Sequence, residues 1–180
     1  RVSPGSRRLS GVEISVLAGT GYNKFHLLAF GADEGNSDLN GLLARIRAGR
    51  GERNPKIVEK LNSLPDLRNA GVTVTMDEVR AEAGPLVVAR PHFVRVLLKK
   101  GVIPTMEEGY RRFLGDRGAA FVPRFHPSPE EAIEIVHAAH GAAVMAHPKF
   151  WTQRAAKLRE GLARLKDRGL DGVEAVYSKN

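Results

Sequence analysis

The chain has 180 residues, enough for one domain or for one domain with an insertion. Its formal net charge of +8 and pI of about 10.1 suit an anionic partner such as nucleic acid or a phosphorylated metabolite. The lack of cysteine excludes disulfides and thiolate metal sites, and no apolar run approaches the roughly 20 residues of a membrane span, so we expect a cytoplasmic protein with no membrane partner.

The first two predicted elements are strands that form a hairpin. Residues 11–17 alternate apolar and polar side chains, as a half-buried strand does, and Glu13 lies on the polar face. A glycine-rich turn leads to a second apolar run at residues 24–30, in which His26 is the ionisable residue inside the run. A carboxylate and an imidazole on paired strands could meet. The alternative is a solvated glutamate and a core histidine that bonds to a backbone carbonyl.

The next part of the chain has the spacing of helices. From Asp38 apolar residues recur every three or four positions, and Pro55 leaves one helix or two helices with a break equally open. Capping-box patterns begin at Thr75, Thr105 and Ser128, and each predicts a further helix.

These helical segments are together too long for a single β-helix-β crossover. We therefore predict that residues 38–127 form a helical insertion in an α/β domain made of residues 1–37 and 128–180. Most of the insertion's basic residues are expected on solvated helix faces. The exception is Arg90 and His92, which flank a proline that favours a helix start. A phosphate would suit that helix N-terminus, and a plain helix start with a surface arginine is the alternative.

A short strand that ends at His147 has the clearest functional signal. Residues 142–146 are small and apolar without alternation, as in a strand covered on both faces, and Pro148 cannot continue the ladder. His147 is therefore expected at a strand tip, where ligands collect in α/β sheets, although a lone histidine there is more often structural. A basic amphipathic helix at 153–168 and a strand at 172–177 complete a right-handed β-helix-β unit.

Taken in order, five segments resemble the PHP (polymerase and histidinol phosphatase) family of phosphoesterases, and their spacing is most similar to its small branch with a helical insertion. The segments are Gly-Val-Glu-Ile-Ser at 11–15, His-Leu-Leu at 26–28, Ala-Arg-Pro-His-Phe at 89–93, Ala-His-Pro at 146–148 and Gly-Val-Glu-Ala-Val-Tyr at 172–177. The resemblance implies part of a distorted β/α barrel and a metal-dependent hydrolase. Such enzymes remove a phosphate from nucleoside 3',5'-bisphosphates or act as 5'-3' exonucleases on short RNA.

The resemblance also implies a metal centre. Glu13, as a bridging carboxylate, and His147 would be its catalytic residues, and His26 would be a further ligand. Ligands of this kind without cysteine suit Mn²⁺ first, with Fe²⁺ or Zn²⁺ as alternatives, and two or three ions would activate a water and stabilise charge on the phosphoryl group. The family's His-x-His and Asp-x-His motifs are absent from the sequence, so we expect a piece of a longer protein that is poorly active alone.

Substrate binding is implied at the insertion and just after His147. By resemblance, Arg90 and His92 would hold a substrate phosphate. Lys149, or alternatively Arg154, would replace an arginine that the family often has after its Ala-His-Pro motif. The partner would then be a nucleotide or a short RNA. The alternative hypothesis is a non-catalytic module that binds nucleic acid or another anion through its basic helices, with structural histidines.

Overall fold

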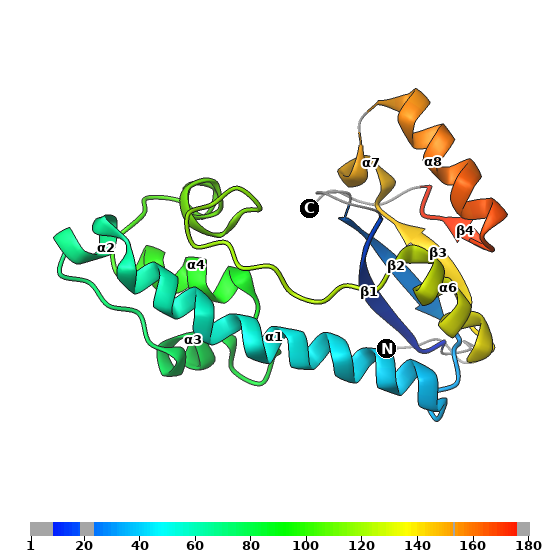
Figure 1. Ribbon diagram of the computed structural model, residues 1–180, viewed down its shortest axis with the longest axis horizontal. Coiled ribbons are helices and arrows are strands. Elements are labelled where there is room, and N and C mark those ends of the chain that lie inside the picture. The colour runs from blue at the N-terminus through cyan, green and yellow to red at the C-terminus, as the bar shows by residue number, and fades with distance from the viewer. Residues whose placement is uncertain (1–8, 19–23, 153, 176–180) are drawn as a thin grey trace, which may run out of the picture. The chain divides into compact units, whose positions relative to one another are not determined.

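The structure is a computed structural model that describes residues 9–18, 24–152 and 154–175 (Figure 1). The predicted α/β class is confirmed, because a four-stranded sheet is combined with helices. Contacts within the chain divide it into two compact units. We call Arg1–Ala44 with His126–Asn180 the sheet unit, and Arg45–Phe125 the helical unit.

The sheet has the strand order β1-β2-β3-β4. Strands β1 (Gly11–Leu17) and β2 (Lys24–Phe30) are antiparallel, as predicted, and the turn at 19–23 lies outside the described residues. Strand β3 (Ala142–Ala146) pairs antiparallel with β2, and β4 (Gly172–Val173) pairs parallel with β3. The predicted strand at 172–177 is thus described as a strand only over its first two residues, and 176–177 are not described.

The two faces of the sheet differ in burial. On one face Ile14, Leu27 and Met145 are fully buried, and helix α6 (Pro129–Ala138) packs against β1, β2 and β3. The other face carries the polar side chains of β1 and β2, which are exposed or half-buried. This alternation follows from the period of two in a strand and leaves the polar face available for a site.

The helices of the sheet unit begin and end largely where the sequence indicates. Ser128 caps α6, because its hydroxyl accepts a hydrogen bond from the Glu131 N–H at 3.0 Å. A short helix α7 (Pro148–Trp151) follows β3, and the basic helix α8 (Ala155–Asp167) ends before Gly169. The positive φ of 95° at Gly169 favours glycine.

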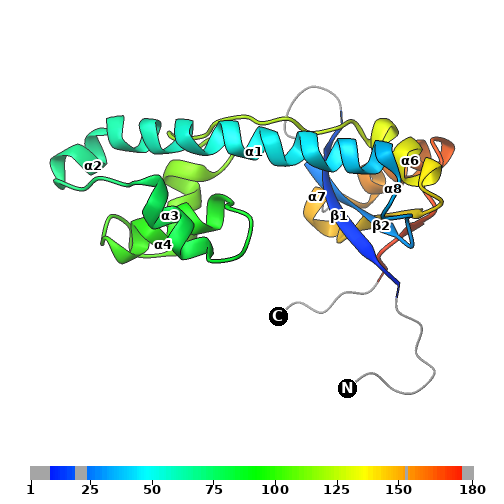
Figure 2. The same ribbon diagram turned by 90° about the horizontal axis from the view of Figure 1, so that it is seen from below.

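Helix α1 (Ser37–Ser63) is continuous through Pro55, so the single helix is the correct alternative. Beyond residue 44 it belongs to the helical unit, where it packs with the elements that follow. Figure 2 shows two of these, α3 and α4, side by side. The remaining elements are α2 (Pro65–Asn69), α3 (Met76–Ala83), α4 (Arg90–Lys99), α5 (Met106–Gly109) and the π-helix η1 (Tyr110–Leu114).

The helical unit has a hydrophobic core of its own. Its largest fully buried side chains are Ile57, Leu61, Leu67, Phe93, Leu97, Phe113 and Leu114. Thr75 and Thr105 cap α3 and α5 as predicted. Whether the insertion is a separate domain with the boundaries 38–127 stays a prediction. Among the described residues, no helix is long and apolar enough to cross a membrane.

Candidate metal centre

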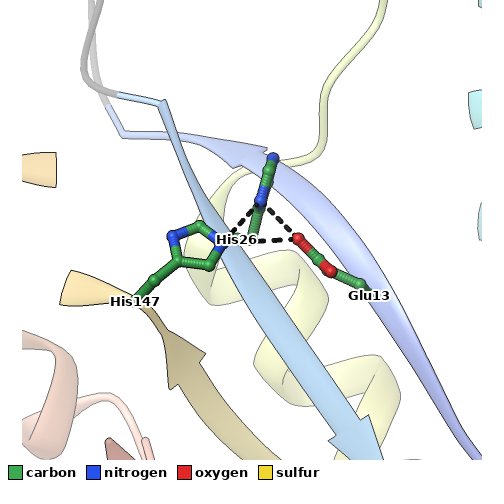
Figure 3. A group of neighbouring side chains, drawn as sticks. All are labelled: Glu13, His26 and His147. Atoms are coloured by element: carbon green, nitrogen blue, oxygen red, sulfur yellow. Dashed lines mark hydrogen bonds and ion pairs between the residues drawn. The ribbon is translucent and has the colours of Figure 1, made fainter. Parts of the chain in front are cut away.

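Glu13, His26 and His147 converge on the polar face of the sheet (Figure 3). Each offers one ligand atom, and these atoms all lie within 4.8 Å of one another. The Nδ1 atom of His26 lies 3.0 Å from Nε2 of His147. The Oε1 atom of Glu13 lies 3.5 Å from the same Nε2 and also contacts His26 Nδ1. The convergence of these three side chains, which we expected from the sequence, is confirmed.

The register of the sheet explains why these side chains meet. Glu13 pairs with Leu28, so Glu13 and His26 are diagonal neighbours on one face of the β1–β2 pair. His26 pairs with Ala146, the last residue of β3. The next residue, His147, therefore leaves the end of β3 beside the His26 ring, and the ring centroids are 4.9 Å apart in an edge-to-face arrangement.

The spacing of the ligand atoms fits a divalent metal ion. Metal–nitrogen and metal–oxygen bonds of about 2.0 to 2.2 Å place neighbouring ligand atoms of one ion roughly 3.0 to 3.5 Å apart. The 3.0 Å and 3.5 Å separations from His147 Nε2 lie in that range. Two imidazoles and one carboxylate without sulfur suit Mn²⁺, Fe²⁺ or Zn²⁺, and three protein ligands leave positions for water or substrate.

The site is open to solvent. The side chains of Glu13, His26 and His147 are 49%, 40% and 26% exposed. Histidine nitrogens and carboxylate oxygens present lone pairs toward one another here, so a proton or a cation has to lie between them.

The backbone of His147 is in the left-handed region, with φ 30° and ψ 61°. Its N–H donates a 2.7 Å hydrogen bond to Oε2 of Glu174, which directly follows β4. No role was predicted for Glu174. A signal was present, because Gly-Val-Glu at 172–174 repeats the Gly-Val-Glu of 11–13.

The structure gives Arg90 and His92 contacts within the helical unit. Arg90 is the first residue of α4, and its Nη1 donates to the Leu114 carbonyl at 2.9 Å and to Asp116 at 3.1 Å. His92 is buried, and its Nδ1 accepts a 3.0 Å hydrogen bond from the Ala89 N–H. Burial lowers the pKa of His92, and the charge of Arg95 adds to this effect. These contacts stabilise the start of α4, and the phosphate-binding role of both residues stays a prediction.

A buried arginine lies close to this helix start. Arg53 is only 6% exposed, and its Nε and Nη2 donate to Oδ1 of Asn54 at 3.2 and 2.7 Å. The amide of Asn54 donates to the Val88 carbonyl, which places this part of α1 beside the residues that precede α4. Within the described residues, no ion pair joins Arg53 to a carboxylate. Arg53 is therefore an exception to the expectation that most basic residues of the insertion lie on solvated helix faces.

Further arginines surround Arg53, and we call the group the arginine cluster. Its members are Arg50, Arg53, Arg90 and Arg124. Burial and then the charges of the other members lower the pKa of Arg53 to about 10. Burial and then the charges of Arg50 and Arg90 lower the pKa of Arg124 to about 10. Gly49 packs against Phe125, which brings the neighbouring Arg50 toward Arg124. Such a concentration of positive charge favours an anion.

Lys149 lies in α7, two residues after His147, and is exposed. Its proposed role toward phosphate stays a prediction.

Comparison with known proteins gives relatives named as enzymes that act on RNA or nucleotides. The chain is 30% identical over 171 residues to a 5'-3' exoribonuclease of Haemophilus influenzae, with 94% of this chain and 59% of the relative covered. It is 28% identical over 169 residues to a 3',5'-nucleoside bisphosphate phosphatase of Chromobacterium violaceum, with 93% and 56% covered. The chain thus spans a little over half the length of these relatives. No family model matches the chain.

Solved structures agree with this result. A protein of Bifidobacterium adolescentis, provisionally named a metal-dependent phosphoesterase, has a TM-score of 0.73 and 30% identity, with 92% of this chain and 56% of that one covered. A Chromobacterium violaceum protein named an amidohydrolase, which holds sulfate and no metal, has a TM-score of 0.76 and 28% identity. This match covers 92% of this chain and 56% of that one. The predicted resemblance is confirmed, because the chain has homologues with names of the predicted kind. These relatives are named 5'-3' exoribonuclease, 3',5'-nucleoside bisphosphate phosphatase and, provisionally, metal-dependent phosphoesterase.

Proposed function

We propose that the chain is part of a metal-dependent phosphoesterase that acts on nucleotides or short RNA. The observation that supports this most directly is the convergence of Glu13, His26 and His147 within 4.8 Å on the open face of the sheet. Relatives named as a nucleotide phosphatase and an exoribonuclease support the substrate class. In the whole protein, the four strands would form part of a distorted β/α barrel.

The proposed chemistry assigns a separate task to each side chain. Bound divalent ions, with Mn²⁺ as our first expectation and two or three in the whole protein, would supply an activated water and charge stabilisation at the phosphoryl group. His26 Nδ1 and His147 Nε2 would hold an ion through neutral imidazoles. Glu13 would offer a second carboxylate oxygen, which can bridge to a further ion. The exposed side of this site would receive the scissile phosphate.

The helical unit would bind another part of the substrate. The arginine cluster includes a buried guanidinium without a carboxylate partner among the described residues, and an anionic group would reduce the repulsion between its members. We propose that this group is a phosphate of the nucleotide or RNA, with Arg90 contributing and with Lys149 acting nearer the metal centre. His92 would act through the helix start that it caps. The cytoplasmic location also stays a prediction.

The second candidate is an anion-binding module without catalysis. The arginine cluster supports it, because such a cluster needs no metal to bind a phosphate. The two candidates differ at the sheet: only the enzyme requires that Glu13 and the two histidines bind an ion.

Metal titration of the 180-residue chain separates the candidates. We expect Mn²⁺ or Co²⁺ to bind the wild-type chain, and His147→Ala to weaken binding by more than about 100-fold, since loss of a direct ligand exceeds the effect of an outer-shell change. The control is His137→Ala, which removes a histidine that pairs with Asp171 and leaves the three ligands in place. Unchanged affinity in His147→Ala, or an equal loss in His137→Ala, would contradict the proposal.

A further inference from the structure

The left-handed backbone of His147 needs a structural cause. Among the described residues other than glycine, only His140 and His147 have a positive φ. Left-handed backbone is unfavourable for a residue with a Cβ, and it persists where surrounding contacts hold it. At His147 the chain leaves β3 and turns into α7, so this conformation sets the direction in which the imidazole projects.

Glu174 supplies a contact that can hold this conformation. Its own N–H donates to the Met145 carbonyl at 2.9 Å, which fixes its backbone to β3 two residues before His147. From there its carboxylate accepts the His147 N–H at 2.7 Å. A hydrogen bond to a charged acceptor is stronger than one between neutral groups. The two bonds close a short loop between the end of β4 and the turn that carries the imidazole.

We propose that Glu174 is a positioning residue of the metal centre. Its carboxylate holds the His147 backbone in the left-handed conformation that directs Nε2 toward His26 and Glu13. Glu174 itself does not belong to the group of converging ligand atoms. This inference depends on the metal-binding role in the proposed function, and it adds a residue to which the sequence analysis assigned no role.

Asp171 provides a matched control on the same pair of strands. Its carboxylate accepts the Ala143 N–H at 2.7 Å, so it also joins the segment around β4 to β3 through a backbone hydrogen bond. Ala143 lies four positions before His147, near the other end of β3. Substitution of Asp171 therefore removes an equivalent link between these segments without removing the contact to His147.

The experiment is a Co²⁺ titration of the 180-residue chain and three variants. Outer-shell substitutions typically change metal affinity by about 10- to 100-fold, and we expect a loss in that range for Glu174→Ala. Glu174→Gln keeps an acceptor oxygen and should lose only a few-fold. Asp171→Ala should keep the wild-type affinity even where its unfolding temperature falls. Wild-type affinity in Glu174→Ala, or an equal loss in Asp171→Ala, would overturn the inference.

Backbone amide NMR in the absence of metal separates this inference from the proposed function. Glu174→Ala should shift the His147 amide resonance upfield together with the ring resonances of His26 and His147, whereas Asp171→Ala should shift the Ala143 amide and leave the rings unchanged. Failure of the wild-type chain to bind Co²⁺ would refute the metal function, and the ring resonances would still decide whether Glu174 positions His147. Unchanged ring resonances in Glu174→Ala would refute the positioning role alone.

Discussion

The metal centre and the arginine cluster concentrate charged groups in opposite ways. At the metal centre, ligand atoms that carry lone pairs converge at an open face, and Glu13 is half exposed. In the arginine cluster, positive groups gather in the helical unit, and Arg53 is almost fully buried. The first arrangement suits a cation or a shared proton, and the second favours an anion. Each region can therefore be tested separately, through metal binding at the sheet and anion binding at the arginine cluster.

The largest expected effect concerns catalysis by the sheet unit. The chain spans 56% of the Chromobacterium violaceum bisphosphate phosphatase, and three ligands suffice to hold one ion. A two- or three-ion mechanism needs more ligands than these. We therefore expect Mn²⁺-dependent hydrolysis of a nucleoside 3',5'-bisphosphate by the 180-residue chain to be slower than that of this relative by at least about 10³-fold. Comparable rates in a phosphate-release assay would show that the site is assigned wrongly.

The next effect tests the arginine cluster. A bound nucleoside 3',5'-bisphosphate should stabilise the wild-type chain by about 2.7 kcal/mol at a ligand concentration 100 times the Kd. Arg53→Met should remove most of this stabilisation. Without ligand the variant should be at least as stable as wild type, because a buried charge without a carboxylate partner is costly. Thermal unfolding with and without the nucleotide measures both effects.

The control for that test is Arg80→Met. Arg80 is an exposed arginine of the same unit, and it pairs with Asp77. It should keep the ligand-induced stabilisation. Equal loss in both variants would mean that the nucleotide responds to net charge alone, and the arginine cluster would then have no special role.

A smaller effect concerns the cap at the start of α4. The Nδ1 of His92 accepts the Ala89 N–H only when it is unprotonated, and burial lowers the pKa of His92. As the pH falls, the His92 ring is therefore protonated in the unfolded chain before it is protonated in the folded chain. The contribution of this cap to stability is complete above the unfolded pKa of about 6.5, and it is lost as the pH falls toward the lowered folded pKa. Loss of a cap costs about 1 kcal/mol.

Urea unfolding at pH 7.5 and pH 5.5 measures this loss. His92→Gln keeps an acceptor at the same helix position and cannot be protonated, so it should show a smaller decrease between the two values. If the free energy of unfolding of His92→Gln fell as much as that of wild type, other groups would cause the pH dependence and the protonation of His92 would not.

Local patterns in the sequence predicted the parts of the structure that local chemistry determines. The alternation around Glu13, the cap at Ser128 and the apolar run before His147 each gave the correct element. The family resemblance added that Glu13, His26 and His147 should meet. The structure supplies the reason, because β3 pairs with β2 although the residues of the helical unit lie between these two strands in the sequence.

Contacts that depend on packing could not be predicted in this way. Arg53 has helical spacing that fits a solvated face, and its burial follows from the placement of Val88 and Asn54 beside it. The role of Glu174 depends on the parallel pairing of β3 with β4 and on the unusual φ of His147. Neither the burial of Arg53 nor the contact of Glu174 with His147 produces a periodic pattern in the sequence from which it could be predicted.

The central claim is that Glu13, His26 and His147 bind one divalent ion, and crystals of the chain grown with Mn²⁺ test it most directly. An anomalous difference map should show a peak within about 2.5 Å of Glu13 Oε1, His26 Nδ1 and His147 Nε2 together, with the His147 N–H still bonded to Glu174. A map with no peak among these atoms at saturating Mn²⁺, or with the ion bound elsewhere in the chain, would contradict the account.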